Sequence, residues 1–349
     1  MRIAVDAMGG DFAPRAVVQG AVDAARELGV GITLVGDLER VDHELGLLET
    51  GGLDIKTVHA PQVVDMKDSA SVVLRRKKDS SIRIATELVK AGEAVGVVSA
   101  GHTGAAMATA LFILGPMKGV ERPAIAALLP SMTGFTVILD AGANVDCKPI
   151  HLSQFAVMGD VFARKVFGIS RPKVGLLSIG EEDTKGNELT KEAFKLLKTS
   201  RLNFVGNVEG RDVFNGTADI IVCDGFIGNV ALKISEGLAE AMNSLLRKEI
   251  EEAIGGQVGY LLLRPAFRKF KKKIDYSEYG GAPLLGINGI SIISHGHSSP
   301  KAIKNAIRVA RDFHIKQVNK HLQSDIESMV SGLAESVEQK PGEKEGVLK

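Results

Sequence analysis

Short runs rich in β-branched residues alternate with longer helical stretches along most of this chain. The runs are almost fully apolar, as in strands whose two faces are both buried. This alternation predicts a mostly parallel sheet covered by helices on both faces, which is an α/β fold. The predicted strands are Ile3–Val5, Ile32–Val35, Ile55–Val58, Gly96–Val98, Ile125–Leu129, Thr136–Leu139, Lys173–Leu177, Asn203–Val208, Ile220–Cys223 and Ile290–Ile293. The predicted helices lie near Pro14–Leu28, Ser81–Ala91, Gly104–Leu114, Ser153–Phe167, Thr190–Lys198, Gly228–Ala253 and Pro300–Gln323.

Length and charge limit the kind of protein that this chain can form. Its 349 residues suffice for about two domains or lobes and for a sizeable core. The 43 basic and 42 acidic residues leave a net charge of +1, which argues against a protein that coats nucleic acid.

Cysteine usage and the N-terminus point to a compartment. Cys147 and Cys223 are too few for a disulfide framework, and neither lies in a Cys-x-x-Cys pair, which favours a reducing environment. The N-terminus enters a strand directly, without the plan of a signal peptide. The longest apolar run, Ala105–Gly115, is far shorter than the roughly 20 residues of a membrane-spanning helix. We therefore expect a soluble, cytoplasmic protein.

Glycine is unusually frequent, at 39 of 349 residues, and many glycines follow predicted strands. In parallel sheets these carboxyl ends line the ligand crevice, and glycine lets backbone N–H groups approach an anion. The alternative is that each glycine is only a turn residue. Neither the dinucleotide-binding nor the P-loop sequence fingerprint is present, so we expect an anion site that lacks the standard nucleotide-binding loops. The turns are Met8–Gly10, Ala100–Gly104, Asp140–Asn144, Gly180 and Asp224–Asn229.

A basic amphipathic insertion at about residues 255–275 interrupts the α/β rhythm. A helix starting at Pro265 would place Phe267, Phe270 and Ile274 on one face. Three interpretations compete: the solvated face of an ordinary helix, a membrane-surface helix, and a docking patch for an acidic protein. The last two are compatible, and nucleic acid is disfavoured because no stacking aromatic residues accompany the charges. The basic residues, without an intervening acid, are Arg264, Arg268, Lys269, Lys271, Lys272 and Lys273.

Histidines in strand-end turns are the main candidates for chemistry. His295 and His297 lie between a predicted strand and a predicted helix, and His102 lies in a similar turn. Such an imidazole could bind an anion or act as an acid or base, although a loop histidine is often only solvent-exposed.

Other polar groups also follow predicted strands, and each alone is more often turn chemistry than catalysis. No nucleophile motif accompanies them. A carboxylate-rich edge could hold Mg²⁺, but no ligand spacing in the sequence requires it. These groups are Asp140, Asn144 and Asp146; Asp224 and Asn229; and Glu182, Asp183, Lys185 and Asn187.

Taken together, the motifs resemble the bacterial phosphate acyltransferases of phospholipid synthesis, the PlsX family. The resemblance runs from Met1 to about Gln323, and the tail Ser331–Lys349 lies outside it and is predicted to be disordered. The motifs, in order, are Val5-Asp6-Ala-Met-Gly-Gly-Asp-Phe-Ala-Pro14, Ser99-Ala-Gly-His-Thr-Gly-Ala105, Leu139-Asp-Ala-Gly-Ala-Asn144, Gly180-Glu-Glu-x-x-Lys-Gly-Asn-Glu188, Cys223-Asp-Gly-Phe-Ile-Gly-Asn-Val230 and Ser294-His-Gly-x-Ser298.

The resemblance implies that inorganic phosphate attacks the thioester of a long-chain acyl-acyl-carrier protein, giving acyl-phosphate and the carrier protein. It also implies a three-layer α/β/α sandwich like that of isocitrate and isopropylmalate dehydrogenases and phosphotransacetylases. We expect one catalytic unit over residues 1–330, with two lobes around a cleft, working as a homodimer without a cofactor or metal. Expected partners are the carrier protein, phosphate, the inner membrane surface and a membrane-bound acyltransferase that consumes acyl-phosphate, but not nucleic acid.

The resemblance also assigns candidate site residues. The catalytic candidates are His295, Ser294 and Lys185, and Ser294-His295-Gly296 is similar to a functional Ser-Arg-Gly of phosphotransacetylases. His102 and His297 depart from the usual Asn and Ser of the family. The phosphate- or substrate-binding candidates are Asp6, Gly9, Gly10, Ser99, Gly101, His102, Thr103, Gly104, Asn144, Asn187, Asp224, Gly225, Gly228, Asn229 and Ser298. The candidates for membrane or carrier-protein contact are Leu261, Leu262, Leu263, Arg264, Phe267, Arg268, Lys269, Phe270, Lys271 and Lys272.

Three alternatives stay open at this point. A phosphotransacetylase that uses acyl-CoA belongs to the same reaction class, whereas a non-catalytic membrane-associated scaffold is supported only by the basic segment. A hydride-transferring dehydrogenase of related fold is disfavoured by the missing dinucleotide fingerprint.

Overall fold

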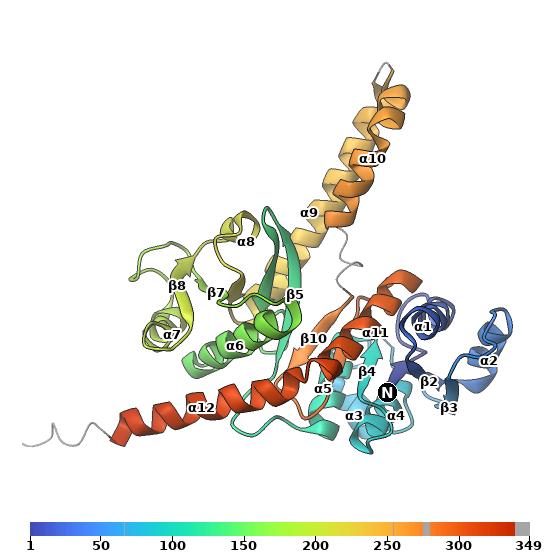
Figure 1. The fold of residues 1–349 in the computed structure, drawn as a ribbon, viewed down its shortest axis with the longest axis horizontal. Helices are drawn as coiled ribbons and strands as arrows, with labels where there is room; N and C mark the ends of the chain where they lie inside the picture. Colours follow the sequence, from blue (N-terminus) through green and yellow to red (C-terminus); the bar gives the residue numbers. More distant parts are fainter. Residues whose placement is uncertain (66, 254, 275–279, 339–349) are drawn as a thin grey trace, which may run out of the picture.

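The computed structural model describes residues 1–65, 67–253, 255–274 and 280–338 (Figure 1). Its strands are β1 (Arg2–Asp6), β2 (Gly31–Gly36), β3 (Ile55–His59), β4 (Gly96–Ser99), β5 (Ala124–Ser131), β6 (Gly134–Leu139), β7 (Lys173–Leu177), β8 (Asn203–Val208), β9 (Ile220–Val222), β10 (Ala282–Leu285) and β11 (Ser291–Ile293). Its helices are α1 (Arg15–Leu28), α2 (Leu38–Gly46), α3 (Ala70–Arg76), α4 (Ser81–Lys90), α5 (Thr103–Leu114), α6 (Pro149–Phe162), the π-helical turn η1 (Ala163–Phe167), α7 (Glu188–Lys198), α8 (Asp212–Asn215), α9 (Gly225–Glu252), α10 (Gly256–Ile274), α11 (Pro300–Ile315) and α12 (Val318–Glu338).

The sheet consists of two parallel halves that run in opposite directions. Its strand order is β3-β2-β1-β4-β11-β10-β5-β6-β9-β7-β8. The strands from β3 to β11 are mutually parallel, and so are those from β6 to β8. Three antiparallel pairings, β11–β10, β10–β5 and β5–β6, lie between the halves, and this odd number of reversals inverts the second half. The predicted α/β fold with a mostly parallel sheet is confirmed.

Helices cover both faces of the first half of the sheet, as alternation along β1 shows. Ile3 and Val5 pack in the same buried cluster as residues of α1 and α11. Ala4, which points to the opposite face, packs with residues of α4 and α5. This arrangement of helix, sheet and helix confirms the predicted three layers.

Helices α9 and α10 form a hairpin that projects from the body of the protein (Figure 1). The rings of Tyr260 and Phe267 on α10 stack with their centroids 5.5 Å apart. Leu261, Leu262 and Leu263 are exposed, at 65, 75 and 55 % respectively. Within the described ranges, no helix combines the length and apolar character needed to cross a membrane.

The hairpin corrects one prediction from the sequence. The basic helix does not start at Pro265 but at Gly256, so Pro265 lies inside α10. Gly255 has a φ of 78°, which ends the turn after α9 and lets α10 begin two turns earlier. Packing of α10 along α9 offsets the backbone hydrogen bond that a proline removes.

The C-terminal helices differ from the prediction as well. The single helix expected over Pro300–Gln323 is two helices, because Gln317 has a φ of 50° and ends α11. This turn lets α12 bury Val318, Leu322 and Ile326. The unit boundary expected at residue 330 falls inside α12, which runs to Glu338. The rest of the predicted disordered tail, residues 339–349, lies outside the described residues.

Candidate active site

The carboxyl ends of three neighbouring parallel strands, β1, β4 and β11, meet at one place. The Ser99 hydroxyl, at the end of β4, donates a 2.7 Å hydrogen bond to Oδ2 of Asp6, at the end of β1. The Gly101 N–H donates to Ser99 Oγ at 3.1 Å. The Ser294 N–H, just past β11, donates to the Ser99 carbonyl at 2.8 Å. The structure therefore brings together Asp6, Ser99, Gly101 and Ser294, as expected for strand ends of one sheet.

Asp6 is a buried carboxyl group held by neutral groups. Burial raises its pKa above the ordinary value, and hydrogen bonds from Ser81, Ser99 and the backbone N–H groups of Met8 and Gly9 lower it only in part. A side chain at Gly9 would place a Cβ 2.5 Å from Asp6 Oδ2 and 2.8 Å from the Gly101 nitrogen. Only glycine allows these turns to lie so close.

A small pocket of about 10 Å³ adjoins this group, which is room for about one water molecule. Asp6, Gly9, Ser99, Gly101 and His102 line it, together with residues that sequence reasoning missed. The missed residues include Val64, from the loop after β3, and Ser81, the first residue of α4.

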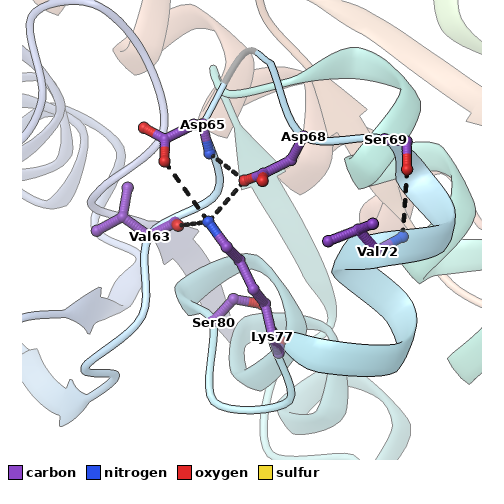
Figure 2. Close-up of polar contacts among 7 residues, drawn as sticks. All are labelled: Val63, Asp65, Asp68, Ser69, Val72, Lys77 and Ser80. Carbon is purple, nitrogen blue, oxygen red and sulfur yellow. Dashed lines mark hydrogen bonds and ion pairs between the residues drawn. The ribbon is translucent and has the colours of Figure 1, made fainter.

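An ion-pair cluster fixes the loop that carries Val64 (Figure 2). Lys77 Nζ lies 2.6 Å from Asp68 Oδ2 and 3.6 Å from Asp65 Oδ2, and it donates to the Val63 carbonyl at 2.7 Å. The hydrogen bond from Lys77 holds the pKa of Asp68 below its usual value, and the same bond raises the pKa of Lys77. These contacts hold the loop over the pocket.

The turns around this group have distinct roles. His102 is the N-cap of α5, because its Nδ1 accepts a 3.1 Å hydrogen bond from the Ala105 N–H. Thr103 and Gly104 form the first turn of α5, where backbone N–H groups are available to an anion. The Gly10–Asp11 turn reaches the loop after β11, since the Asp11 N–H donates to the Gly296 carbonyl at 2.9 Å.

The loop after β11 contains the two remaining histidines. His295 Nε2 lies 3.0 Å from Lys233 Nζ on α9, and Ser298 Oγ donates to the His295 carbonyl at 2.5 Å. His297 Nδ1 lies 3.0 Å from Asp11 Oδ2. Ser294 Oγ is buried and has no hydrogen-bond partner among the described residues. A buried hydroxyl without a partner marks a place where a ligand can accept its hydrogen bond.

A second group surrounds the buried Asp140, at the start of the loop after β6. Its Oδ1 accepts from the N–H groups of Ile125, Gly142 and Ala143, and its Oδ2 accepts from the N–H and the Nδ2 of Asn144. Burial raises the pKa of Asp140, and these hydrogen bonds lower it in part. Asn144 also donates to the Pro123 carbonyl at 2.7 Å. Both side chains thus hold the loop.

The remaining predicted residues of this group form the start of α9. Asp224 is its N-cap and accepts from the Ile227 N–H at 2.9 Å. Gly225 and Gly228 face Asp140, and Asn229 is exposed on the first turns and faces Gly142. Ala141 and Ala143 share a hydrophobic cluster with Ile293 of β11, which connects this group to the first.

Lys185 and Asn187 lie elsewhere. Asn187 is the N-cap of α7 and accepts from the Thr190 N–H at 2.9 Å. Lys185 is exposed in the turn before it. Among the described residues, no hydrogen bond joins either side chain to Asp6, Ser99 or His295, so the catalytic role predicted for Lys185 stays a prediction.

Of the basic segment, Leu261, Leu262, Leu263, Arg264, Arg268, Lys269 and Phe270 are exposed on α10, whereas Phe267 is half-buried. Lys271 and Lys272 belong to α10, but their side chains lie outside the described part.

Neither cysteine is a thiolate at neutral pH. Burial, with the nearby Asp140 carboxylate, raises the pKa of Cys147 to about 11. Burial raises the pKa of Cys223 well above its ordinary value. The site offers no activated thiol at either position.

Solved structures with this fold place the chain in one class of α/β proteins. A phosphotransacetylase from Streptococcus pyogenes matches with a TM-score of 0.60 and 21 % identity, over 90 % of this chain and 94 % of that one. The EutD phosphotransacetylase from Staphylococcus aureus matches with a TM-score of 0.59 and 19 % identity, over 89 % of this chain and 94 % of that one. A 4-hydroxythreonine-4-phosphate dehydrogenase from Klebsiella pneumoniae matches with a TM-score of 0.51 and 14 % identity, over 90 % of this chain and 99 % of that one. The fold is that of phosphotransacetylases.

Sequence relatives then define the family. The family model described as "Fatty acid synthesis protein" matches residues 1–321. The chain is 60 % identical over 341 residues to the phosphate acyltransferase of Citrifermentans bemidjiense, covering 98 % of this chain and 97 % of the relative. It is 58 % identical over 328 residues to that of Geobacter sulfurreducens, covering 94 % and 95 %. The chain therefore belongs to the phosphate acyltransferase family of fatty acid synthesis proteins, as the motifs predict, and it is an acyltransferase.

Proposed function

We propose that this acyltransferase moves a long-chain fatty acyl group from acyl-acyl-carrier protein to inorganic phosphate. The products are acyl-phosphate, a precursor for phospholipid synthesis, and the carrier protein with its thiol restored. The observation that carries the proposal is the meeting of the β1, β4 and β11 ends, where Ser294 Oγ, beside His295, is buried and has no partner within the part of the chain that the structure describes. Membership in the phosphate acyltransferase family supports the same reaction class.

The proposed chemistry is direct displacement. An oxygen of hydrogen phosphate attacks the thioester carbonyl carbon, a C–O bond forms, and the C–S bond breaks. The proton of the phosphate passes, through His295, to the departing thiolate. Ser294 donates a hydrogen bond to the oxyanion that forms on the carbonyl. The raised pKa values of Cys147 and Cys223 support direct attack rather than an acyl-cysteine intermediate. Because phosphate is itself the nucleophile, this route needs no cofactor or metal.

We propose that α10 meets the partners of the reaction. Its exposed leucines lie near the tip of the hairpin, and Arg264, Arg268 and Lys269 follow toward the body of the protein. This order suits a membrane surface, with apolar side chains at the headgroup boundary and cations beside anionic lipids. The same cations suit an acidic carrier protein. The surface could also deliver acyl-phosphate to a membrane-bound acyltransferase at the inner face of the membrane.

We also propose a homodimer built on α9. Val230, Ile234, Leu238, Met242 and Leu245 are 41, 64, 55, 60 and 61 % exposed. Their spacing of four, four, four and three residues forms one continuous apolar stripe along the helix. A stripe of this length favours burial against the same stripe of a second copy.

The decisive experiment measures thiol release from a long-chain acyl-carrier-protein thioester with and without phosphate. We expect release that depends on phosphate, and at least about 100-fold slower release in His295→Ala. His43→Ala, an exposed histidine of α2, is the control. The absence of release with any chain length would overturn the proposal, and faster release from acyl-CoA than from the carrier protein would favour a phosphotransacetylase.

A further inference from the structure

Lys233 makes a contact that its own helix does not require. It lies on the third turn of α9, and its Nζ is 3.0 Å from His295 Nε2 and 2.8 Å from Glu236 Oε2. Glu236 Oε2 is also 3.7 Å from His295 Nε2. The contact joins α9, which begins after β9 in the second half of the sheet, to the loop after β11 in the first half.

The charges of Lys233 and Glu236 contribute little to the stability of the fold and suit the binding of a ligand. Burial raises the pKa of Glu236, but the hydrogen bonds with His295 and Lys233 together lower it by more than burial raises it. The pKa of Glu236 is therefore below its ordinary value. Glu236 is therefore ionised at neutral pH and balances the ammonium of Lys233. Lys233 is 54 % exposed, and an ion pair this exposed adds only about 0–1 kcal/mol to stability.

The hydrogen-bonding capacity of Lys233 is only partly used. A lysine ammonium has three N–H donors. The described contacts of Lys233 use two, one to the Glu236 carboxylate and one to the His295 ring nitrogen. The third donor and the positive charge lie beside His295, where the proposed reaction needs a cation for an incoming dianion.

We propose that Lys233 is a cationic ligand of the phosphate substrate, next to His295, and that Glu236 is a positioning residue that holds its ammonium in place. The inference rests on the proposed function, because it assigns the substrate of that site. It adds a residue of α9, the helix that follows β9 in the second half of the sheet. Helix α9 thus completes the phosphate site.

The test compares Lys233→Met with Lys233→Arg and Glu236→Gln in steady-state phosphorolysis. Losing one charge-assisted hydrogen bond predicts a rise of about 10-fold or more in KM for phosphate in Lys233→Met. The KM for the acyl donor should stay within about twofold, because the thioester carries no anion at this position. Lys233→Arg keeps the charge and should recover part of the affinity, and Glu236→Gln should raise the phosphate KM less than Lys233→Met.

A matched control and a second readout separate binding from folding. Lys248→Met removes another α9 lysine from an ion pair, that with Glu252 at 3.8 Å, and should leave both KM values unchanged. Inorganic phosphate should raise the melting temperature of the unaltered protein, and Lys233→Met or Lys233→Gln should reduce that rise. An unchanged phosphate KM, or a full thermal response to phosphate in both Lys233 variants, would overturn the inference. Failure of the unaltered protein to release thiol would instead overturn the proposed function, while the thermal response would still test phosphate binding at Lys233.

Discussion

Folding disfavours the ionised form of the Asp6 side chain. Its pKa is raised by burial, so the folded protein binds a proton at this carboxyl group more tightly than the unfolded chain does. The free energy of unfolding contributed by Asp6 is therefore highest below the unfolded pKa. It falls as the pH rises through the raised native pKa and stays low above it. The burial of Asp6 therefore costs stability at neutral pH.

We predict that Asp6→Asn raises the melting temperature at pH 7 and lowers the phosphorolysis rate by about 10-fold or more. The amide cannot ionise, so it removes the pH-dependent cost of burying this group, and it fills the same space. The difference in melting temperature between Asp6→Asn and the unaltered protein should shrink as the pH falls toward the unfolded pKa of about 3.9. Differential scanning calorimetry over that pH range measures it. A lower melting temperature at pH 7, or an equal effect of Asp42→Asn on the exposed α2, would contradict the prediction.

The sequence predicts, for a physical reason, that some of these side chains lie close together. Asp6, Ser99 and Ser294 follow runs that read clearly as strands, and ends of neighbouring parallel strands must meet. Ser81 and Lys233 were missed because they lie on helices, and their approach to Asp6 and His295 depends on how those helices pack. The spacing of Lys233 and Glu236 indicates an ion pair but says nothing of His295.

At the scale of elements, the start of α9 is fixed by close backbone approach. A Cβ at Gly228 would lie 1.9 Å from the Asp140 carbonyl oxygen, so α9 could not keep its position with any side chain there. Nothing lies within 4 Å of a Cβ at Gly237, further along the same helix.

We predict opposite effects of alanine at these two positions. Gly228→Ala should lower the free energy of unfolding by about 3 kcal/mol or more, because backbone atoms cannot yield as a flexible side chain can. Gly237→Ala should raise it by about 0.5–1 kcal/mol through helix propensity alone. Urea denaturation followed by circular dichroism measures both. Equal effects of the two substitutions would show that the contact with Asp140 does not determine where α9 begins.

The tip of the α9–α10 hairpin gives a second prediction at this scale. Leu262→Glu combined with Leu263→Glu should weaken binding to vesicles containing phosphatidylglycerol by about 100-fold, because two leucine side chains no longer enter the lipid boundary. Co-sedimentation measures the binding. Phe267 is a poorer target, since its ring stacks on Tyr260 and its loss would also disturb packing along α10.

The control for the vesicle experiment is Met132→Glu, which removes an 85 % exposed side chain from the turn between β5 and β6. It should bind vesicles as the unaltered protein does. Equal binding by all three proteins would refute membrane contact through these leucines and leave the carrier protein as the partner of the basic residues.

Element boundaries show where local patterns suffice. Lys173–Leu177 and Asn203–Val208 were predicted with the bounds that the structure has, because each is a short run between clear helical patterns. Strand β10 (Ala-Pro-Leu-Leu) was missed, since it is four residues long, contains a proline and has no β-branched residue. Its pairing with β11 and β5 is a tertiary effect.

At the scale of the whole molecule, the stripe on α9 determines the expected assembly. We predict that Leu238→Glu with Met242→Glu converts a dimer into a monomer, because two carboxylates would be buried without partners at the interface. Light scattering after size exclusion should give twice the chain mass for the unaltered protein and the chain mass for the variant. Glu240→Lys, on the opposite side of α9, is the control and should stay dimeric. A monomeric unaltered protein would contradict the proposal.

The sheet is continuous and has two oppositely directed halves, and the two lobes expected from chain length stay a prediction. Length alone could not show that both halves belong to one continuous sheet. That arrangement depends on β10 and β11, which come from near the end of the chain. The substrate cleft between the lobes stays a prediction.

The late position of β10 and β11 in the chain sets an order on folding during synthesis. Ser291 pairs with Val97, and Leu284 pairs with Ile125, so both pairings join residues very distant in sequence. Until the ribosome has made β10 and β11, one edge of β4 and one edge of β5 lack their partner strands. The two halves of the sheet cannot join before that point. Contacts of such high order fold slowly, and open strand edges attract other chains. We therefore expect a stage, late in translation, in which the open strand edges make the nascent protein prone to aggregation.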